Sequence, residues 1–380
     1  MSKTLILLII LFSCCLSIVL SSMPDRPPLV NDSHDVSIYQ ERGSWILSGQ
    51  QPYRDVFSEY PQLATYLFAI PHVISNFLDG GRTYRYVFSL MMAICLAIST
   101  VLIYKLRPDR KYLAFLMFLP ASVYFTHNRY DIVPSLFIVA SLVLLFKDRF
   151  YLSIFLLAIS VMFKWYPVVL VPIFVSYYYT LYGRINWIMV GIFLMTIILI
   201  ITPTILLIDW EGFLIPYLYH LQRGINKESL LYLIIAVFKY FGLYRVKVES
   251  YFVIAFLLFQ FAIPVLSVFG KVNDKSKVIW WSTSSILCFM LFAKFYSPQW
   301  LLWIIPFLII EARSQRDIIA IILFDILTYI YFPISYGFSR GNFYAIFIAV
   351  IIVKTGFILY FFFHSFFKVH RDIGFIYKSS

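Results

Sequence analysis

Long apolar runs alternate with short polar stretches along most of the chain. The runs recur from Leu5 to the C-terminal region, and most have the roughly 17 to 25 residues that an α-helix needs to cross a bilayer. Glycine and proline interrupt several runs, as membrane helices allow. The pattern therefore predicts an all-α, polytopic membrane protein with about twelve transmembrane helices.

Composition excludes a water-soluble domain with a polar coat. Of the 380 residues, 61% are hydrophobic, 20% are aromatic and only 13% are charged, far from the composition of a soluble globular domain. We expect one integral membrane domain over 1–380. Its expected parts are a first transmembrane helix 5–22, a first extracytoplasmic loop 23–83, transmembrane helices in 84–208, an extracytoplasmic segment with a surface helix 209–250, transmembrane helices in 251–362 and a cytoplasmic tail 363–380.

Positive charge indicates the orientation. Lysine and arginine concentrate in alternate polar segments, and the positive-inside rule assigns those segments to the cytoplasm. If 230–243 is a surface helix rather than a transmembrane span, more of the basic residues that follow it in the sequence lie on the cytoplasmic side. The first apolar run has no small-x-small cleavage pattern after it, so we interpret it as a retained helix. These assignments predict a multi-pass protein of the cell membrane with both termini in the cytoplasm.

The remaining polar groups collect on the opposite, extracytoplasmic face. Ionisable residues near membrane depth are costly, so they usually pair, line a cavity or bind a charged ligand. Any one of them could instead be a helix cap, a turn acid, an internal ion pair or an interfacial anchor. Together they predict a functional site made from Asp35, Asp55, Glu59, Arg129, Asp131, Lys164, Arg223, Glu228, Lys294 and Gln299.

The first extracytoplasmic loop has its own pattern. Val36, Tyr39, Gly43 and Ile46 or Leu47 stand at helical spacing behind Asp35, which suits an interfacial helix with an acid at its amino end. The stretch 49–61 is typical of a turn, and 62–78 predicts a second apolar helix along the membrane.

Acids and cations on one face suit sugar transfer from a lipid-linked phosphate. A carboxylate can remove the proton of the attacking hydroxyl, and lysine or arginine can stabilise the departing phosphate. The chain carries no DxD motif, and its four cysteines lie in apolar runs without metal-ligand spacing. We therefore expect a metal-independent reaction without a cofactor.

Five stretches between about 30 and 310 resemble a known family in the same order. They are "HDVSIYQERGSWILSGQQPYRDVFSEYPQL", "NRYDIVPSL", "FKWYPVVLVP", "HLQRGINKES" and "KFYSPQWLLWIIPF". Together they resemble the polyprenol-phosphate-mannose-dependent glycosyltransferases of the GT-C superfamily, in their prokaryotic α-mannosyltransferase branch. The run "EYPQL" departs from the more usual tyrosine-proline-proline. The resemblance implies an outward-facing active site, a carboxylate base in the first loop, inversion at the sugar and an isoprenoid-phosphate donor.

Roles follow for the residues on that face. Asp35 is the expected general base, with Asp55 as the second candidate. The donor phosphate would be held by Lys164, Arg223, Lys294 and Arg129, and sugar or acceptor hydroxyls by Asp131, Glu228, Gln299 and Glu59. A glycan or glycolipid is the expected acceptor. The net charge of +12 favours contact with anionic lipid over nucleic acid. A secondary transporter or lipid flippase and a non-catalytic structural subunit are the alternative functions.

Overall fold

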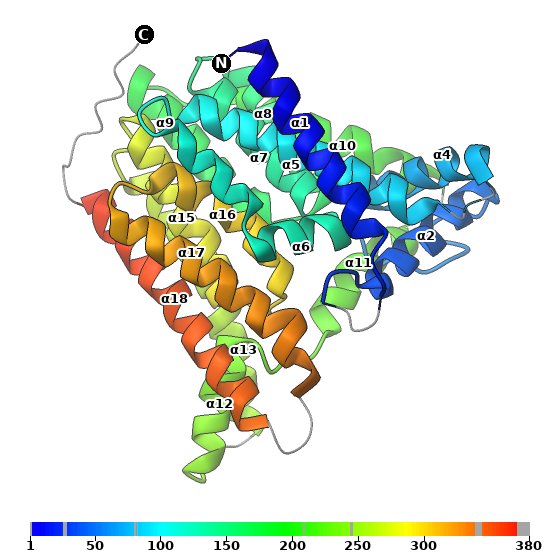
Figure 1. Cartoon of the computed structure of the whole chain (residues 1–380). Coiled ribbons are helices and arrows are strands. Elements are labelled where there is room, and N and C mark those ends of the chain that lie inside the picture. The colour runs from blue at the N-terminus through cyan, green and yellow to red at the C-terminus, as the bar shows by residue number, and fades with distance from the viewer. Residues whose placement is uncertain are drawn as a thin grey trace. The chain divides into compact units, whose positions relative to one another are not determined.

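The chain is helical throughout the part that the computed structural model describes, namely residues 2–25, 29–79, 81, 83–207, 210–243, 246–338 and 344–370 (Figure 1). Within these ranges the only β-type pairing is an isolated bridge between Pro52 and Val56. The prediction of an all-α protein is confirmed. The predicted cytoplasmic tail lies outside the described residues from 371 onward.

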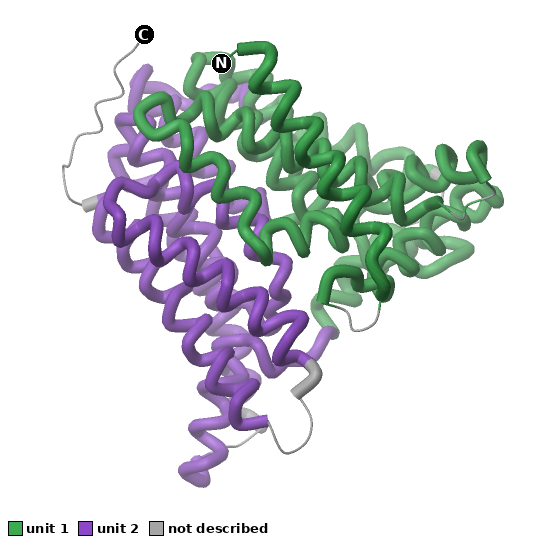
Figure 2. Tube along the Cα trace, in the orientation of Figure 1, with its two compact units in different colours: residues 1–165, 191–222 green, residues 166–190, 223–380 purple. Residues whose placement is uncertain are grey.

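Two compact units divide the chain, with residues 1–165 and 191–222 in unit 1 and residues 166–190 and 223–380 in unit 2 (Figure 2). Unit 1 contains α1 (Lys3–Ser21), α2 (Ser33–Leu47), α3 (Gln62–Leu67), α4 (Ala69–Asp79), α5 (Tyr84–Leu106), η1 (Lys111–Phe118), α6 (Pro120–Asn128), α7 (Ile132–Leu145), α8 (Phe150–Phe163), most of α10 (Trp187–Leu207) and α11 (Trp210–Gln222).

Unit 2 is built around α15, which packs against α14, α16, α18 and η2. Its elements are η2 (Tyr166–Leu170), α9 (Val171–Tyr182), the start of α10, α12 (Leu230–Tyr240), α13 (Val246–Phe259), α14 (Ala262–Phe269), α15 (Lys275–Leu291), η3 (Pro298–Trp300), α16 (Leu301–Glu311), α17 (Gln315–Tyr329), η4 (Ile330–Ile334), η5 (Ser335–Phe338) and α18 (Tyr344–His370). The predicted surface helix 230–243 appears as α12, whose 11 residues rise only about 16 Å, too little to cross a bilayer alone.

Six helical stretches among the described residues are long and apolar enough to cross a membrane: α1, α5, α10, α13 with α14, α17 with η4, and α18. A bent pair, α6 and α7, would make a seventh. Further apolar helices of 10 to 17 residues include α8 and α12. A membrane-embedded helical protein is thus supported, while the number of about twelve spans stays a prediction.

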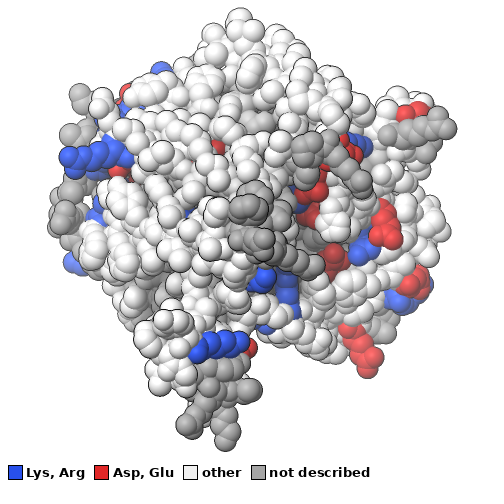
Figure 3. Space-filling view, turned by 60° about the horizontal axis from the view of Figure 1, so that its bottom comes forward, with Lys and Arg blue, Asp and Glu red and all other residues white. Residues whose placement is uncertain are grey.

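The surfaces of these helices suit a lipid environment. On α1, Leu8 and Phe12 are 56% and 57% exposed, and on α10 Leu199 is 66% exposed. Most of the surface visible in Figure 3 carries neither acidic nor basic side chains. Large apolar side chains exposed in this number would be costly in water, so these helices are best solvated by acyl chains.

Unit 1 folds the first loop onto its own helices. Helix α2 packs against α3 and α4, and α3 packs against α8. As the spacing predicted, α2 buries Val36, Tyr39 and Gly43, but at the end of the predicted face Ile46 is only half-buried and Leu47 is exposed. The predicted helix 62–78 is instead two helices, α3 and α4, which meet at Phe68.

Gly43 is required where α2 meets that junction. A Cβ on Gly43 would lie 2.4 Å from the carbonyl oxygen of Phe68, closer than atoms can approach, and backbone cannot move aside as a flexible side chain can. We expect Gly43→Ala to destabilise unit 1 by roughly 1 to 3 kcal/mol, the usual cost of overpacking. The unfolding temperature in detergent measures this. Gly49→Ala is not a matched control because Gly49 has a positive φ of 81°, whereas Gly191→Ala is suitable because nothing lies near its Cβ position.

Candidate functional site

The segment 127–131 comprises the last residues of α6 and the link to α7, and the two helices are bent by 112°. At Arg129 the backbone becomes extended, with φ −140° and ψ 152°, and α7 begins just after Asp131. All five residues of the segment are buried, with no more than 5% of any residue exposed. Polar groups placed at such depth need partners, and the first loop supplies several of them.

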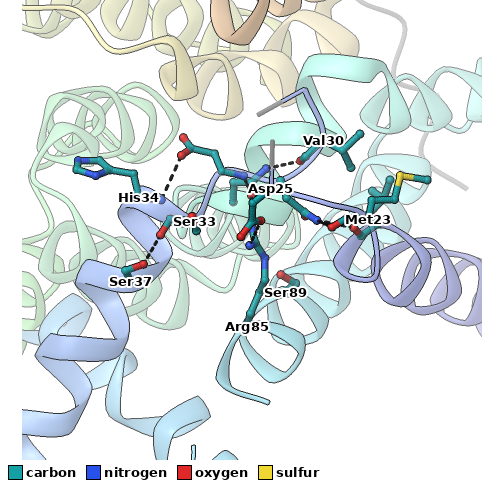
Figure 4. Close-up of polar contacts among 12 residues, drawn as sticks. Met23, Asp25, Val30, Ser33, His34, Ser37, Arg85 and Ser89 are labelled. Carbon is teal, nitrogen blue, oxygen red and sulfur yellow. Dashed lines mark hydrogen bonds and ion pairs between the residues drawn. The ribbon is translucent and has the colours of Figure 1, made fainter. Parts of the chain in front are cut away.

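The start of the first loop is hydrogen-bonded to this segment (Figure 4). Asn31 Oδ1 lies 2.7 Å from His127 Nε2. The Asp32 amide donates to Asn128 Oδ1 over 2.9 Å, and Asn128 Nδ2 donates to the carbonyl of Val30 over 2.9 Å. Because an amide oxygen only accepts, Nε2 of His127 carries the proton in this pair. These bonds fix the position from which α2 begins.

Arg85 supports the same contact from α5. Its guanidinium pairs with Asp25, and Nη2 donates to Asn128 Oδ1 over 3.2 Å. Figure 4 shows Asp25 facing the Arg85 side chain beside the chain that leads into α2. Ser89, one turn further along α5, donates to the carbonyl oxygen of His127 over 3.0 Å. Helix α5 thereby holds both the 127–131 segment and the start of the loop.

Arg129 joins the carboxylates at the start of α2. Its Nη2 lies 2.6 Å from Asp32 Oδ2, and its Nε lies 2.7 Å from Asp35 Oδ2. The Arg129 side chain is 6% exposed, whereas Asp32 and Asp35 are 14% and 23% exposed. The cation is therefore buried beneath carboxylates that a solute can still reach.

Asp32 is also the N-cap of α2, because its side chain accepts from the His34 amide over 3.2 Å. Burial raises the pKa of Asp32. The charge of Arg129 and the hydrogen bonds from Arg129 and His34 outweigh burial, so the pKa lies below its ordinary value of 3.8.

That lowered pKa makes a pH-dependent contribution to stability. A carboxyl whose pKa falls on folding stabilises the fold above its unfolded pKa, and this contribution is lost as the pH falls through the lowered value. We expect Asp32→Asn to lower the unfolding temperature at pH 6, and expect the difference from wild type to shrink as the pH drops below about 4. A difference that grows on acidification would contradict the assignment.

A second ion pair follows directly in the sequence. Lys164 Nζ donates to Asp131 Oδ1 over 2.5 Å, and Nζ also lies 4.9 Å from the centre of the Tyr130 ring. Asp131 is fully buried, whereas the Lys164 side chain is 21% exposed. Lys164 ends α8 in an extended conformation, which turns its side chain out of the helix. Arg129 and Asp131, two residues apart in the same bend, thus each take part in an ion pair.

A cluster of aromatic side chains packs beside these ion pairs. Tyr39 stacks on Phe68 at 4.4 Å between ring centres and contacts Tyr60, Phe88 and Tyr130 at 5.4 to 5.8 Å. Closely packed rings exclude water, and the lower local dielectric strengthens the electrostatic interactions of the ion pairs next to them. We call Asp32, Asp35, Arg129, Asp131 and Lys164 the unit 1 charge cluster.

An open polar hollow borders this cluster beside the start of α2. It encloses about 670 Å³ and is lined by Asp25, Asp32, Ser33, His34, Ser37, Ile38 and Glu41. Hydroxyl, imidazole and carboxylate groups are the partners that sugar hydroxyls use. The hollow gives a solute a route to Asp32.

The other predicted residues of unit 1 have partners in their own loop. Arg54 binds Asp55 through both oxygens at 2.9 and 3.1 Å, and the Gln51 amide donates to Asp55 over 2.8 Å. The hydrogen bond from Arg54 lowers the pKa of Asp55. Glu59 pairs with Arg42 at 3.3 Å. Asp55 is therefore built into a turn, whereas Asp35 belongs to the charge cluster.

Unit 2 holds the remaining predicted residues. The Asn226 amide donates to the Lys294 carbonyl over 3.3 Å, and the Arg223 guanidinium carbon lies 4.5 Å from the centre of the Phe295 ring. Gln299 lies in η3, and Glu228 precedes α12. The hydrogen bond between Asn226 and Lys294 joins two connections of unit 2. The first is residues 223–229, which contain Arg223, and the second is residues 292–297, which contain Lys294.

Sequence reasoning missed Asp32, Asn31 and the hydrogen-bonding roles of His127 and Asn128. Asp32 had a usable signal, since an aspartate directly before a helical pattern is a favoured N-cap. The contacts between Asn31 and His127 and between Asn128 and Val30 carry no comparable sequence signal, because the two partners are separated by 96 and 98 positions.

No protein-family model matches this chain, and a comparison with curated proteins finds no match. Among the described residues, no group of three or more His, Cys, Asp or Glu side chains is placed to hold a metal ion. A function is therefore inferred from the chemistry of the units themselves.

Proposed function

We propose that the chain is a membrane glycosyltransferase of the GT-C type. It would move a hexose, with mannose as the expected sugar, from a polyprenyl-phosphate donor to a glycan or glycolipid acceptor on the extracytoplasmic face, with inversion and without a metal. The observation that carries the proposal is the unit 1 charge cluster. In it the buried Arg129 pairs with the partly exposed Asp32 and Asp35, the partly exposed Lys164 pairs with the buried Asp131, and an open polar hollow reaches Asp32.

Asp35 is the proposed general base. Such a base must come within about 2.6 to 3.2 Å of the hydroxyl whose proton it removes, and the 23% exposure of Asp35 leaves room for that approach. Arg129 holds one carboxylate oxygen in place. Its pairing with both Asp32 and Asp35 favours a positioning role for Arg129 over the phosphate binding expected from the sequence.

Lys164 is the proposed phosphate-binding cation of unit 1. Its side chain is 21% exposed, so an anionic group can approach the ammonium while Asp131 holds it. As the sugar leaves, negative charge grows on the phosphate, and a cation fixed in advance lowers the barrier without having to reorganise. Arg223 and Lys294 lie in unit 2 and are proposed, within that unit, to bind a lipid phosphate.

A transporter is the second candidate, because one observation favours it. Lys354 lies fully buried within α18, a membrane-length helix, and transporters commonly place ionisable groups at such depth. A transporter moves its substrate unchanged, whereas a transferase makes a new glycosidic bond.

Proteoliposomes that contain the purified protein distinguish the two. They would be given polyprenyl-phosphate mannose labelled in the sugar, together with a membrane glycolipid extract. We expect the label in a new glycosidic bond, at a rate that a chelator leaves unchanged. Recovery of intact donor on the far side of the bilayer, with no new glycoside, would favour the transporter.

A further inference from the structure

Lys354 is a charged residue in the interior of an apolar helix. It lies ten residues into α18 and is 0% exposed. An ammonium group at this depth is costly and persists where it has a defined task. Lys354 belongs to unit 2 and is not a member of the unit 1 charge cluster.

Two rings and a carbonyl surround the ammonium. Nζ lies 3.4 Å from the centre of the Tyr296 ring and 4.7 Å from that of Tyr331. It also donates to the backbone carbonyl oxygen of Glu228 at 3.5 Å. A desolvated cation over an aromatic face gains more than an exposed one. Lys354 therefore joins α18 to η4 and to both connections of unit 2.

Tyr296 is fixed on its other sides. Its amide donates to Asn226 Oδ1 over 2.9 Å, and Asn226 Nδ2 donates to its carbonyl oxygen over 2.6 Å. The Trp300 ring centre lies 5.5 Å from that of Tyr296. Asn226 thus ties the 223–229 connection to the 292–297 connection, and Lys354 contacts both where they are joined.

These two connections carry the cations that the sequence assigns to the donor phosphate. Arg223 begins the first connection, and Lys294 lies two residues before Tyr296. We infer that Lys354 is a positioning residue, which holds the 223–229 and 292–297 connections so that Arg223 and Lys294 together bind the phosphate of a lipid. The inference rests on the proposed function and specifies where a lipid phosphate is held in unit 2.

The test measures binding of undecaprenyl phosphate, without a sugar, to the full-length protein in nanodiscs. We expect Lys354→Met to weaken binding by about tenfold or more, because a displaced charge-assisted contact is worth more than 1.4 kcal/mol. Lys354→Arg should restore most of the affinity, since arginine keeps the charge and stacks on rings. Tyr296→Leu removes the ring but keeps the lysine, so it should weaken binding as much as Lys354→Met does. It provides the test if Lys354→Met fails to fold.

Lys368→Met is the matched control. Lys368 lies on the same helix and pairs with buried Glu311 at 2.9 Å. Its replacement therefore tests whether removing any paired lysine of α18 weakens lipid binding. We expect binding within about threefold of wild type for this variant. A loss as large as that of Lys354→Met would overturn the inference.

A double-mutant cycle separates positioning from general support of the fold. If Lys354 acts through Arg223, then Lys354→Met combined with Arg223→Met should lose little more affinity than Arg223→Met alone. Fully additive losses would overturn the inference. Normal binding by Lys354→Met would also overturn it and leave the proposed function intact. Failure of wild type to bind undecaprenyl phosphate would remove the proposed donor, and the inference with it.

Discussion

Asp35→Asn is expected to reduce sugar transfer by about 100-fold or more, because removal of a positioned general base usually costs 10² to 10⁴ in rate. Asparagine has the shape of aspartate and keeps an oxygen that can contact Arg129, whose Nε lies 2.7 Å from Asp35 Oδ2. It cannot take up the proton of the acceptor hydroxyl. The fold should therefore survive, and the unfolding temperature should change much less than the rate.

Asp55→Asn is the matched control for this variant. Asp55 is also a carboxylate of the first loop that is paired with an arginine, but that arginine is its neighbour Arg54 in an exposed turn. We expect this variant to keep most of the activity. If Asp55→Asn loses transfer and Asp35→Asn keeps it, Asp55 is the base and the charge cluster has another role.

Arg129→Met is expected to affect both stability and activity. The substitution leaves Asp32 and Asp35 beside the aromatic cluster without the cation that balances them, and breaking a buried pair by removing one partner commonly costs roughly 3 to 5 kcal/mol. Their exposures of 14% and 23% allow some relief from water, so we expect about 2 to 4 kcal/mol, together with loss of transfer.

Arg129→Lys tests whether charge alone is enough. Lysine keeps the charge but has no planar fork to bind both carboxylates at once. It should recover most of the stability and little of the transfer rate. Arg54→Met, which removes an arginine from an exposed pair, should leave the unfolding temperature close to that of wild type. Equal effects of Arg129→Met and Arg54→Met would contradict the role assigned to Arg129.

Local patterns in the sequence predicted the elements that depend on local forces. The spacing of Val36, Tyr39 and Gly43 predicted the helix and its buried face, because a helix repeats every 3.6 residues. The same reasoning treated 62–78 as one helix. It missed the break at Phe68, because that break lies where the carbonyl of Phe68 approaches Gly43, and a contact between distant residues leaves no periodic signal.

The candidate site shows the same division between local and distant information. Their charge near expected helix ends was the reason to single out Asp35, Arg129, Asp131 and Lys164, since ionisable residues near membrane depth are costly. The sequence alone does not show which of these residues pair with one another. Arg129 and Asp131 suggested an internal pair, yet Arg129 binds carboxylates more than 90 positions away and Asp131 binds Lys164. Only the bend between α6 and α7 brings these partners together.

The transfer rate in a single turnover, with donor already bound, directly tests whether Asp35 is the general base, because this rate reports the chemical step apart from donor binding. Wild type and Asp35→Asn would be loaded with labelled polyprenyl-phosphate mannose, mixed with acceptor and stopped at intervals. We expect similar donor affinity for both proteins and a rate about 100-fold lower, or lower still, for Asp35→Asn. Equal single-turnover rates would contradict the claim that the carboxylate above Arg129 removes the acceptor proton.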